Sequence, residues 1–410
     1  MTKIKEIIKI LSGAFLVAGT SIGGGMLALP VLCARVGLLP SLLVMVAVWA
    51  FMTSTALIYL ECSTWMKKDA HLVTMASNLL GKLGKNICWT VFVLICYASL
   101  VAYLSGGGRL VEEAAKVFFN YDLSQGSAYF IYAGIFGGLL LFGTSFAGSV
   151  NSILFGLLIL LFVLMIQGTS NIDHSLLLRQ DWKITGLVAL VPMMLTTFSF
   201  PGIVPVLVSY HKRKVSHIRA SILSGTGLTM IIYAIWLITV LGNVPWEGEH
   251  GLAAAFAADK HACDSLVHYL EKPSLNILAQ CFAFLALSTS FIGLSMGLNH
   301  FLSEGLKIDM KRLWGKFTLV LLIILPTLFI KFQFERVFFH ALDMSGGIGD
   351  GVLSGFIPAL MLWKGRYIKN FQSSYRFFGN KLVLFVIFVL SSSVVLYEIT
   401  KLISDFVSSQ

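Results

Sequence analysis

Two short helix-breaking clusters inside apolar segments carry the residues best suited to bind a ligand. The first is Gly23-Gly24-Gly25, which interrupts the apolar stretch 10–36. Each glycine disfavours a helix by about 1 kcal/mol relative to alanine, and unwound backbone inside a bilayer persists only when protein buries it or it lines a cavity. One interpretation is a glycine face for close helix packing. The interpretation we favour is a broken helix whose freed backbone groups bind a zwitterion.

The second cluster, at residues 197–202, reads Thr-Phe-Ser-Phe-Pro-Gly and is followed by Pro205. Proline removes a helical hydrogen-bond donor and glycine tolerates unusual backbone angles, so this segment is also predicted to be broken. A lone proline kink would be weak support, because such kinks are common. Two interrupted spans at matching positions of two halves, in opposite membrane orientations, are typical of inverted-repeat transporters.

The chemistry expected at these breaks follows from the electrostatics of helix ends. The half-helix after Gly25 presents unpaired amides and a positive dipole end, which suit a carboxylate. The half-helix before Ile22 ends in free carbonyls at 18–20, and these suit an ammonium group, as do the carbonyls around Phe198 and Ser199. A carboxylate site beside an ammonium site describes an α-amino acid.

Aromatic side chains near the breaks are candidates for the walls of such a site. The candidates are Tyr97, Tyr103, Phe198 and Phe200. Aromatic residues make up 12% of the chain, so packing in the core or against lipid is the commoner role for any one of them.

The composition of the chain is that of a helical protein with many membrane spans. Of the 410 residues, 57% are hydrophobic and 12% are charged, against about 25% charged residues in an ordinary soluble domain. The N-terminus resembles a signal peptide, but its apolar run continues without a cleavage site, so we expect a retained first span. The six cysteines form no C-x-x-C pair, and we expect neither a metal nor a cofactor.

Eleven spans are expected, since each needs about 20 mostly apolar residues. They are placed at about 10–36, 40–66, 86–117, 127–146, 150–169, 185–209, 216–243, 274–303, 314–331, 336–363 and 382–404. Residues 1–170 would form a first inverted repeat broken at 23–25, and residues 185–363 a second repeat broken at 198–202. The eleventh span, 382–404, would follow them.

Lysines and arginines gather in alternate connections of this arrangement. These connections are 3–9, 67–85, 212–219, 307–316 and 364–381. The positive-inside rule makes them cytoplasmic, which places the N-terminus inside and the C-terminus outside. The net charge of +10 is therefore a signal of topology, and no nucleic-acid partner is expected. The long loop 243–273 on the opposite side shows helical alternation and is expected to form a short helical cap over the outer mouth.

Four motifs in these spans resemble the bacterial aromatic amino acid permeases. They are AGTSIGGGMLALP in span one, YASLVAYLSGGG in span three, FSFPGIVPVLVSY in span six and ALSTSFIGLSMGL in span eight. The resemblance covers nearly the whole chain and is strongest to the tyrosine-specific members of the group. The first motif is specific within this group, although its I-G-x-G core also occurs in the wider amino acid permease superfamily.

The resemblance implies a fold, an activity and a set of contacts. The fold is an all-α LeuT-type fold with five plus five inverted-repeat helices and an eleventh span. The activity is proton-driven uptake of tyrosine, phenylalanine or tryptophan through the bacterial inner membrane, with tyrosine favoured. The implied substrate contacts are Thr20, Ser21, Ile22, Gly23, Gly24, Gly25, Met26, Phe198, Ser199, Phe200 and Gly202.

Span six departs from the pattern of the family. Members of the family read closer to F-G-F-H-G there, whereas this chain has Ser199 and Pro201 in place of the glycine and the histidine. A proton role of that histidine therefore does not carry over. Span ten departs as well, because it is usually apolar in these permeases and here holds Asp343 and Asp350.

Asp350 is the leading candidate for ion coupling. It lies about 14 residues into span ten, close to mid-bilayer at a rise of ~1.5 Å per residue. A carboxyl at that depth is a functional candidate by default, and a purely structural, hydrogen-bonded carboxyl is the equal alternative. Its flanking glycines are Gly346, Gly347, Gly349 and Gly351. These glycines would let the span adjust as the charge is neutralised.

Other ionisable residues in the spans are given secondary roles. Asp343 lies two turns further out on the same face, where a pair with Arg35 or Arg109 could form an outer gate. Glu61 lies at the inner end of span two, where we expect it to reach the interface, and it is the next candidate for proton coupling.

Two hydroxyls in span eight keep sodium coupling open. By resemblance, Thr289 and Ser290 fall where the LeuT fold holds a sodium ion. Hydroxyls in membrane helices more often bond their own backbone, which is the plainer expectation.

The sequence favours a secondary transporter over an enzyme. It contains no H-E-x-x-H, G-x-S-x-G or GxxxxGK[ST] motif, so neither hydrolase chemistry nor an ATPase is expected. The alternatives are a proton- or sodium-coupled transporter of small neutral or hydroxy amino acids, and a non-transporting amino acid sensor. A sensor would need a cytoplasmic output domain, and no loop is long enough for one.

Overall fold

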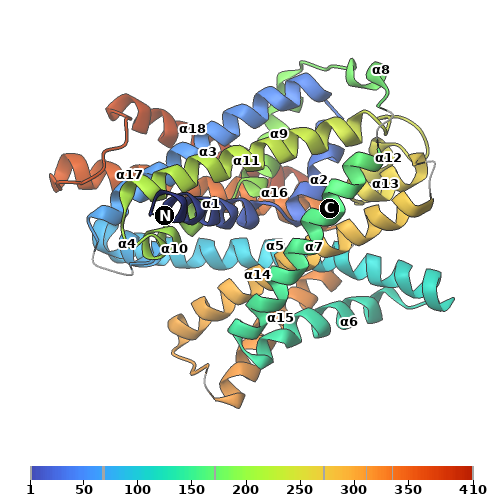
Figure 1. Ribbon diagram of the computed structural model, residues 1–410, viewed down its shortest axis with the longest axis horizontal. Coiled ribbons are helices and arrows are strands. Elements are labelled where there is room, and N and C mark those ends of the chain that lie inside the picture. Colours follow the sequence, from blue (N-terminus) through green and yellow to red (C-terminus); the bar gives the residue numbers. More distant parts are fainter. Residues whose placement is uncertain are drawn as a thin grey trace.

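The computed structural model is an all-helical bundle (Figure 1). It describes residues 2–66, 70–169, 172–270, 273–310, 312–334 and 336–408. Among the basic residues of the predicted cytoplasmic connections, Lys67, Lys68 and Lys311 lie outside the described residues.

The first half of the chain contains α1 (Thr2–Ser21), α2 (Gly24–Cys33), α3 (Leu38–Thr64), α4 (Leu72–Leu80), α5 (Lys82–Phe119), α6 (Gln125–Gly138), η1 (Leu139–Phe142), α7 (Thr144–Gly168) and α8 (His174–Leu177). The rest contains α9 (Ile184–Thr197), η2 (Pro201–Ile203), α10 (Val204–Tyr210), α11 (Val215–Leu241), α12 (Leu252–Ala257), α13 (Ala262–Tyr269), α14 (Pro273–Leu306), α15 (Leu313–Gln333), α16 (Phe338–Met344), η3 (Ser345–Phe356), α17 (Ile357–Trp363), η4 (Lys364–Ile368) and α18 (Lys381–Ser408).

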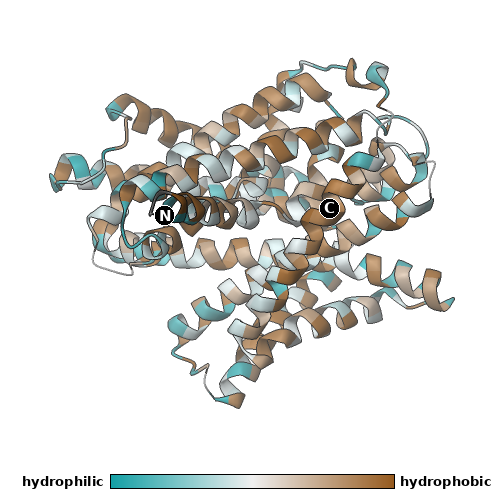
Figure 2. Cartoon of the chain, viewed as in Figure 1, coloured by the Kyte–Doolittle hydropathy of each residue, from teal (hydrophilic) through white to brown (hydrophobic). Residues whose placement is uncertain are grey.

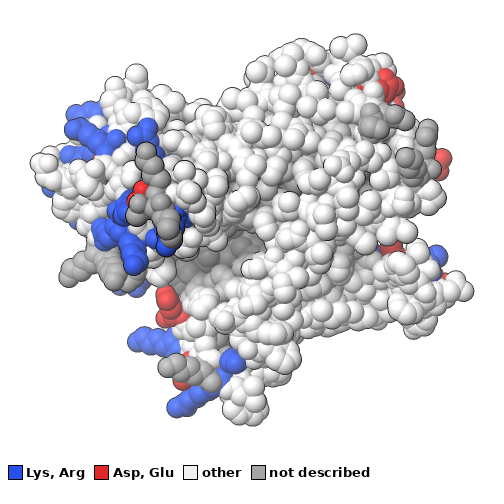
Figure 3. Space-filling view, in the orientation of Figure 1, with Lys and Arg blue, Asp and Glu red and all other residues white. Residues whose placement is uncertain are grey.

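The number of membrane-length helices agrees with the prediction. In the described part of the chain ten helices are long and apolar enough to cross a membrane, and the bent pair α1 and α2 makes an eleventh span. Apolar residues cover the lengths of these helices and polar residues gather at their ends (Figure 2). On the face shown in Figure 3, lysines and arginines gather at the end of the bundle that holds the N-terminus, α4, α10 and α17.

Both predicted breaks lie close together at the centre of the bundle. The first span bends by 61° between α1 and α2, and the sixth span loses helical structure at 198–200 between α9 and η2. Helix α2 packs against α9, α11 and α14, so three other spans surround the first break.

Among the ten membrane-length helices of the described chain other than the bent first span, span ten is the most buried, and it contains a π-helix, η3. Three of its glycines face α18 at intervals of four residues. A Cβ on Gly347, Gly351 or Gly355 would lie 2.8, 2.8 and 2.1 Å from Glu398, Val395 and Ser391. These glycines therefore let α18 pack directly against the η3 backbone, as small residues do between membrane helices.

The loop 243–273 contains two short helices, α12 and α13, which pack against α2. Within it, the Asp259 carboxylate accepts hydrogen bonds from the amides of Phe338 and Phe339, at 2.8 and 3.1 Å. The carboxylate thus satisfies orphan amides at the start of α16, as a helix cap does. The loop is thereby tied to the N-terminal end of span ten.

Candidate substrate site

The glycines of the first break let three other helices approach the start of α2. The Gly24 amide donates a hydrogen bond to Ser290 Oγ at 2.9 Å. A Cβ on Gly24 would lie 2.5 Å from the Tyr103 ring, and one on Gly25 would lie 3.2 Å from Thr197 Cγ2. The positive end of α2 is therefore enclosed by α5, α9 and α14. These glycines both permit close helix packing and lie at the bend of the first span.

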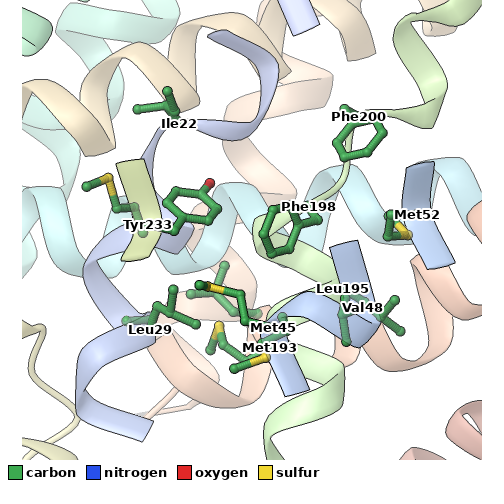
Figure 4. Close-up of a cluster of buried hydrophobic side chains, with 14 of the residues drawn as sticks. Ile22, Leu29, Met45, Val48, Met52, Met193, Leu195, Phe198, Phe200 and Tyr233 are labelled. Atoms are coloured by element: carbon green, nitrogen blue, oxygen red, sulfur yellow. The ribbon is translucent and has the colours of Figure 1, made fainter. Parts of the chain in front are cut away.

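A tyrosine on α11 joins the two breaks. The Tyr233 hydroxyl lies 2.6 Å from the Ser21 carbonyl oxygen and 2.9 Å from the Thr197 carbonyl oxygen. These two carbonyls end α1 and α9, so the negative ends of two helices converge on one hydroxyl. The Tyr233 ring packs edge-on against Phe198 with a centroid distance of 5.2 Å (Figure 4). One turn further along α11, Trp236 Nε1 donates to the Met26 carbonyl at 2.9 Å.

The remaining residues predicted to contact the substrate fall into three groups. Ile22, Met26, Phe198 and Phe200 are buried. Ser21 is also buried, and its hydroxyl has no hydrogen-bond partner among the described residues. Thr20 and Gly202 are exposed, the Thr20 hydroxyl bonds the Val17 carbonyl at 2.7 Å, and a Cβ on Gly202 would meet nothing within 4 Å.

The structure brings one of the two predicted tyrosines to the breaks. Tyr103 lies against Gly24, as described above. The Tyr97 hydroxyl instead donates to the Leu322 carbonyl on α15, at 2.6 Å.

Asp350 is connected to the second break. Its side chain is 2% exposed, and its Oδ1 accepts hydrogen bonds from Ser199 at 2.8 Å and from Ser354 at 2.7 Å. Its Oδ2 has no hydrogen-bond partner among the described residues. Ser199 belongs to the non-helical segment, so the carboxyl of span ten directly contacts the break in span six.

Glu61 does not reach the interface, which corrects the expectation from its position in span two. Its carboxylate is 1% exposed and accepts two hydrogen bonds from Arg366, at 2.7 and 2.5 Å. The Phe377 amide donates to it as well, at 2.5 Å. Arg366 lies in η4, at the end of span ten, so the buried ion pair joins α3 to span ten. The Phe377 amide also ties the segment before α18 to the same carboxylate.

Removing one member of a buried ion pair should destabilise the protein by roughly 3–5 kcal/mol, because it leaves an uncompensated charge. We therefore expect Glu61→Gln to lower the thermal unfolding temperature of the purified protein. The matched control is Glu6→Gln, which removes an exposed pair with Lys214 and should change little. Normal stability of Glu61→Gln with loss of proton-driven uptake would instead support coupling at Glu61.

The predicted arginine partners of Asp343 are also corrected. Asp343 pairs with Lys401 of α18, with Nζ 2.7 Å from Oδ2. Arg109 donates to the Asp259 carbonyl of the loop 243–273 at 2.6 Å, and Arg35 is exposed. The lysine comes from the last span, which the sequence did not place beside span ten.

The two span-eight hydroxyls take different partners. Thr289 bonds the Leu285 and Ala286 carbonyls of its own helix, at 2.8 and 3.3 Å, as such hydroxyls commonly do. Ser290 accepts the Gly24 amide instead, and thus belongs to the first break.

Sequence reasoning missed Tyr233, Trp236 and Thr197. A usable signal existed for the first two, because a buried tyrosine or tryptophan in an apolar span needs a hydrogen-bond partner. That signal does not say which carbonyl is the partner. A helix break leaves carbonyls without an intrahelical partner. A buried tyrosine or tryptophan that needs an acceptor could therefore have been expected to bond a carbonyl at one of the breaks.

The geometry and the comparisons identify the class of protein. The chain aligns with the crystal structure of MhsT in complex with L-phenylalanine with a TM-score of 0.63 at 14% identity, covering 95% of this chain and 97% of that one. The protein therefore has a LeuT-type fold. Residues 6–398 match the tryptophan/tyrosine permease family, and the chain belongs to that family.

Named relatives cover almost the whole chain. The tryptophan-specific transport protein of Haemophilus influenzae is 29% identical over 391 residues, which are 92% of this chain and 93% of the relative. The tyrosine-specific transport system 1 of the same organism is 28% identical over 386 residues, which are 93% and 94% of the two chains. The resemblance seen in the sequence is thus confirmed at the level of the family.

Tyr233→Phe should lower substrate transport about tenfold or more while the protein still reaches the membrane. The change removes the single hydroxyl proton that the Ser21 and Thr197 carbonyls share, and an unsatisfied buried group costs about 1–3 kcal/mol. Tyr97→Phe is the matched control, because it also removes a tyrosine–carbonyl bond, but at α15. Initial uptake rates at equal membrane abundance measure the effect. Equal losses in the two variants would assign Tyr233 a role in packing alone.

Proposed function

We propose that this protein imports aromatic amino acids, with tyrosine favoured, across the bacterial inner membrane in symport with protons. Its family and the names of its relatives support an aromatic substrate. Tyrosine is favoured by the motifs described above, and the choice between tyrosine and tryptophan is part of the proposal.

The observation that carries the proposal is the opposed charge at the two breaks. The positive end of α2 begins at Gly24, and the negative ends of α1 and α9 meet at Tyr233. A carboxylate is stabilised at the first and an ammonium group near the second. An α-amino acid carries both groups on one carbon, so it fits across the breaks with its side chain directed toward the Phe198 and Tyr103 rings.

Proton coupling is supported by the position of Asp350. Two hydroxyls donate to its Oδ1, which leaves Oδ2 as the oxygen able to carry a proton. Protonation would remove a buried charge one hydrogen bond away from the second break. The coupling ion could thus act on the segment that binds substrate. Sodium coupling near Thr289 and Ser290 is the alternative. Uptake driven by a sodium gradient without a pH gradient would support sodium, and uptake that needs the pH gradient would support protons.

The orientation proposed is that of the positive-inside rule. The N-terminus and the basic end of the bundle would be cytoplasmic, and the loop with α12 and α13 would face outward (Figure 3). The C-terminus would then lie outside.

Counterflow in proteoliposomes tests the proposed substrate. Vesicles preloaded with unlabelled tyrosine would be given a panel of labelled amino acids at equal concentration. We expect labelled tyrosine, phenylalanine or tryptophan to enter well above alanine, serine and glutamine. Preferential entry of a small neutral amino acid would overturn the aromatic assignment, and no counterflow by any of them would favour a sensor.

A further inference from the structure

A buried acidic cluster joins span ten to α18 and contains none of the residues proposed to bind the substrate. It consists of Asp343 on α16 and Glu398 and Lys401 on α18. The side chains of Glu398 and Asp343 are 1% and 9% exposed, whereas the Lys401 side chain retains 27% exposure. Glu398 is therefore covered by η3, and Lys401 is the member of the cluster that is accessible at the protein surface.

The charges of this cluster do not balance. Two carboxylates and one ammonium group leave one net negative charge in a buried place, which is costly without a further partner. Asp343 Oδ1 and Glu398 Oε2 have no hydrogen-bond partner among the described residues. One bound proton would neutralise the cluster and supply a donor for one of these oxygens.

The distances distinguish the two carboxyls. Lys401 Nζ lies 2.7 Å from Asp343 Oδ2 but 3.7 Å from Glu398 Oε1. The lysine therefore stabilises the ionised form of Asp343 more strongly. Glu398 packs against η3, where a Cβ on Gly347 would lie only 2.8 Å from its Cβ and Cγ. The charge of Glu398 is thus compensated less by the lysine than that of Asp343, and its side chain is the more buried of the two.

Other titratable groups act on the cluster from its outer side. They are His340 on α16, and Tyr397 and Asp405 on α18. His340 and Asp405 are exposed, so water screens their charges more than those inside the cluster.

We propose that Asp343, Glu398 and Lys401 form a proton-binding site, separate from the substrate site, in which Glu398 carries one exchangeable proton. The proton reaches it from the end of the bundle where Lys401 is partly exposed. Because η3 also contains Asp350, the protonation of Glu398 bears on the packing of the same segment. The site does not depend on the identity of the substrate or of the coupling ion.

Infrared difference spectroscopy of the purified full chain in nanodiscs tests this site. The pH would be varied and the stretching band of protonated carboxyls followed. We expect one titrating component to disappear in Glu398→Gln and to persist in Asp350→Asn. Asp405→Asn is the matched control on the same helix and should leave the component unchanged.

A second variant keeps the proposal testable if Glu398→Gln folds poorly. Lys401→Met removes the positive charge, so the proton on Glu398 should be retained to a pH higher by about 1–3 units. Tyrosine binding measured on the same samples reports separately on the substrate site. The proposal is overturned if the component survives Glu398→Gln, if it is lost only in Asp343→Asn, or if Lys401→Met leaves its midpoint unchanged.

Discussion

Asp350→Asn should abolish the uphill accumulation of tyrosine in vesicles with an imposed pH gradient, while equilibrium exchange continues. Asparagine resembles the protonated acid and keeps an acceptor for Ser199 and Ser354, but it cannot release a proton. The binding site would therefore remain assembled, and only the coupling would be lost. Accumulation and exchange should be measured in the same vesicle preparation.

Ser354→Ala is the control for this experiment. It removes one of the two hydrogen bonds to Asp350 and leaves the carboxyl, so gradient-driven accumulation should persist. Accumulation by Asp350→Asn in response to the pH gradient would make Asp350 structural. Accumulation that follows a sodium gradient in the wild type would move the coupling site toward Thr289 and Ser290.

Gly24→Val should abolish both uptake and exchange without removing the protein from the membrane. A Cβ at this position would lie 2.5 Å from the Tyr103 ring, closer than real Cβ atoms approach a neighbour, and 3.0 Å from Leu287 Cδ2, which is a tight contact. The two further methyl carbons of valine would occupy the space beside the α2 amides, where the substrate carboxylate is proposed to bind. Counterflow of labelled tyrosine at equal membrane abundance is the measurement.

The matched control is Gly227→Val on α11. A Cβ on Gly227 would meet nothing within 4 Å, so the same substitution should cost only a small loss of helix propensity. Tyrosine counterflow at the wild-type rate in Gly24→Val would remove the first break from the substrate site.

The fold could be predicted from the sequence because its signals are local. Hydrophobic length determines the number of spans, and the confirmed resemblance determines the LeuT-type fold. The glycine triplet and the sequence FSFPG predict irregular backbone within a few residues of the observed bend in span one and the observed non-helical segment in span six. Span length and the two breaks act through neighbours along the chain, whereas the resemblance extends over nearly all of it.

The partners of the polar groups could not be predicted because they lie far apart in the sequence. Tyr233 is 212 residues from Ser21, and Glu61 is 305 residues from Arg366. A buried glutamate needs a cation as its partner, and the sequence of span two does not indicate that this cation is Arg366 of span ten. The partner of Asp343 could not be predicted for the same reason, since Lys401 comes from the last span.

The π-helix of span ten shows a limit of another kind. Its glycines are interpreted from the sequence as a source of flexibility around Asp350, and this stays a prediction. The structure adds that they are also contact points, since Gly346, Gly347 and Gly349 face Thr196, Glu398 and Ile95. Small residues permit both outcomes, and only the positions of the neighbouring helices decide between them.

The central claim is that two helix breaks hold the two charged groups of an amino acid, and competition by substrate analogues tests it most directly. Counterflow of labelled tyrosine would be inhibited with tyrosine, with tyramine, which lacks the carboxylate, and with 3-(4-hydroxyphenyl)propanoate, which lacks the amine. A hydrogen bond to a charged group contributes about 1.5–3 kcal/mol, so each analogue should compete roughly 10–100-fold less well than tyrosine. If either analogue competes as well as tyrosine, its missing group is not recognised, and the proposed site between the breaks is wrong.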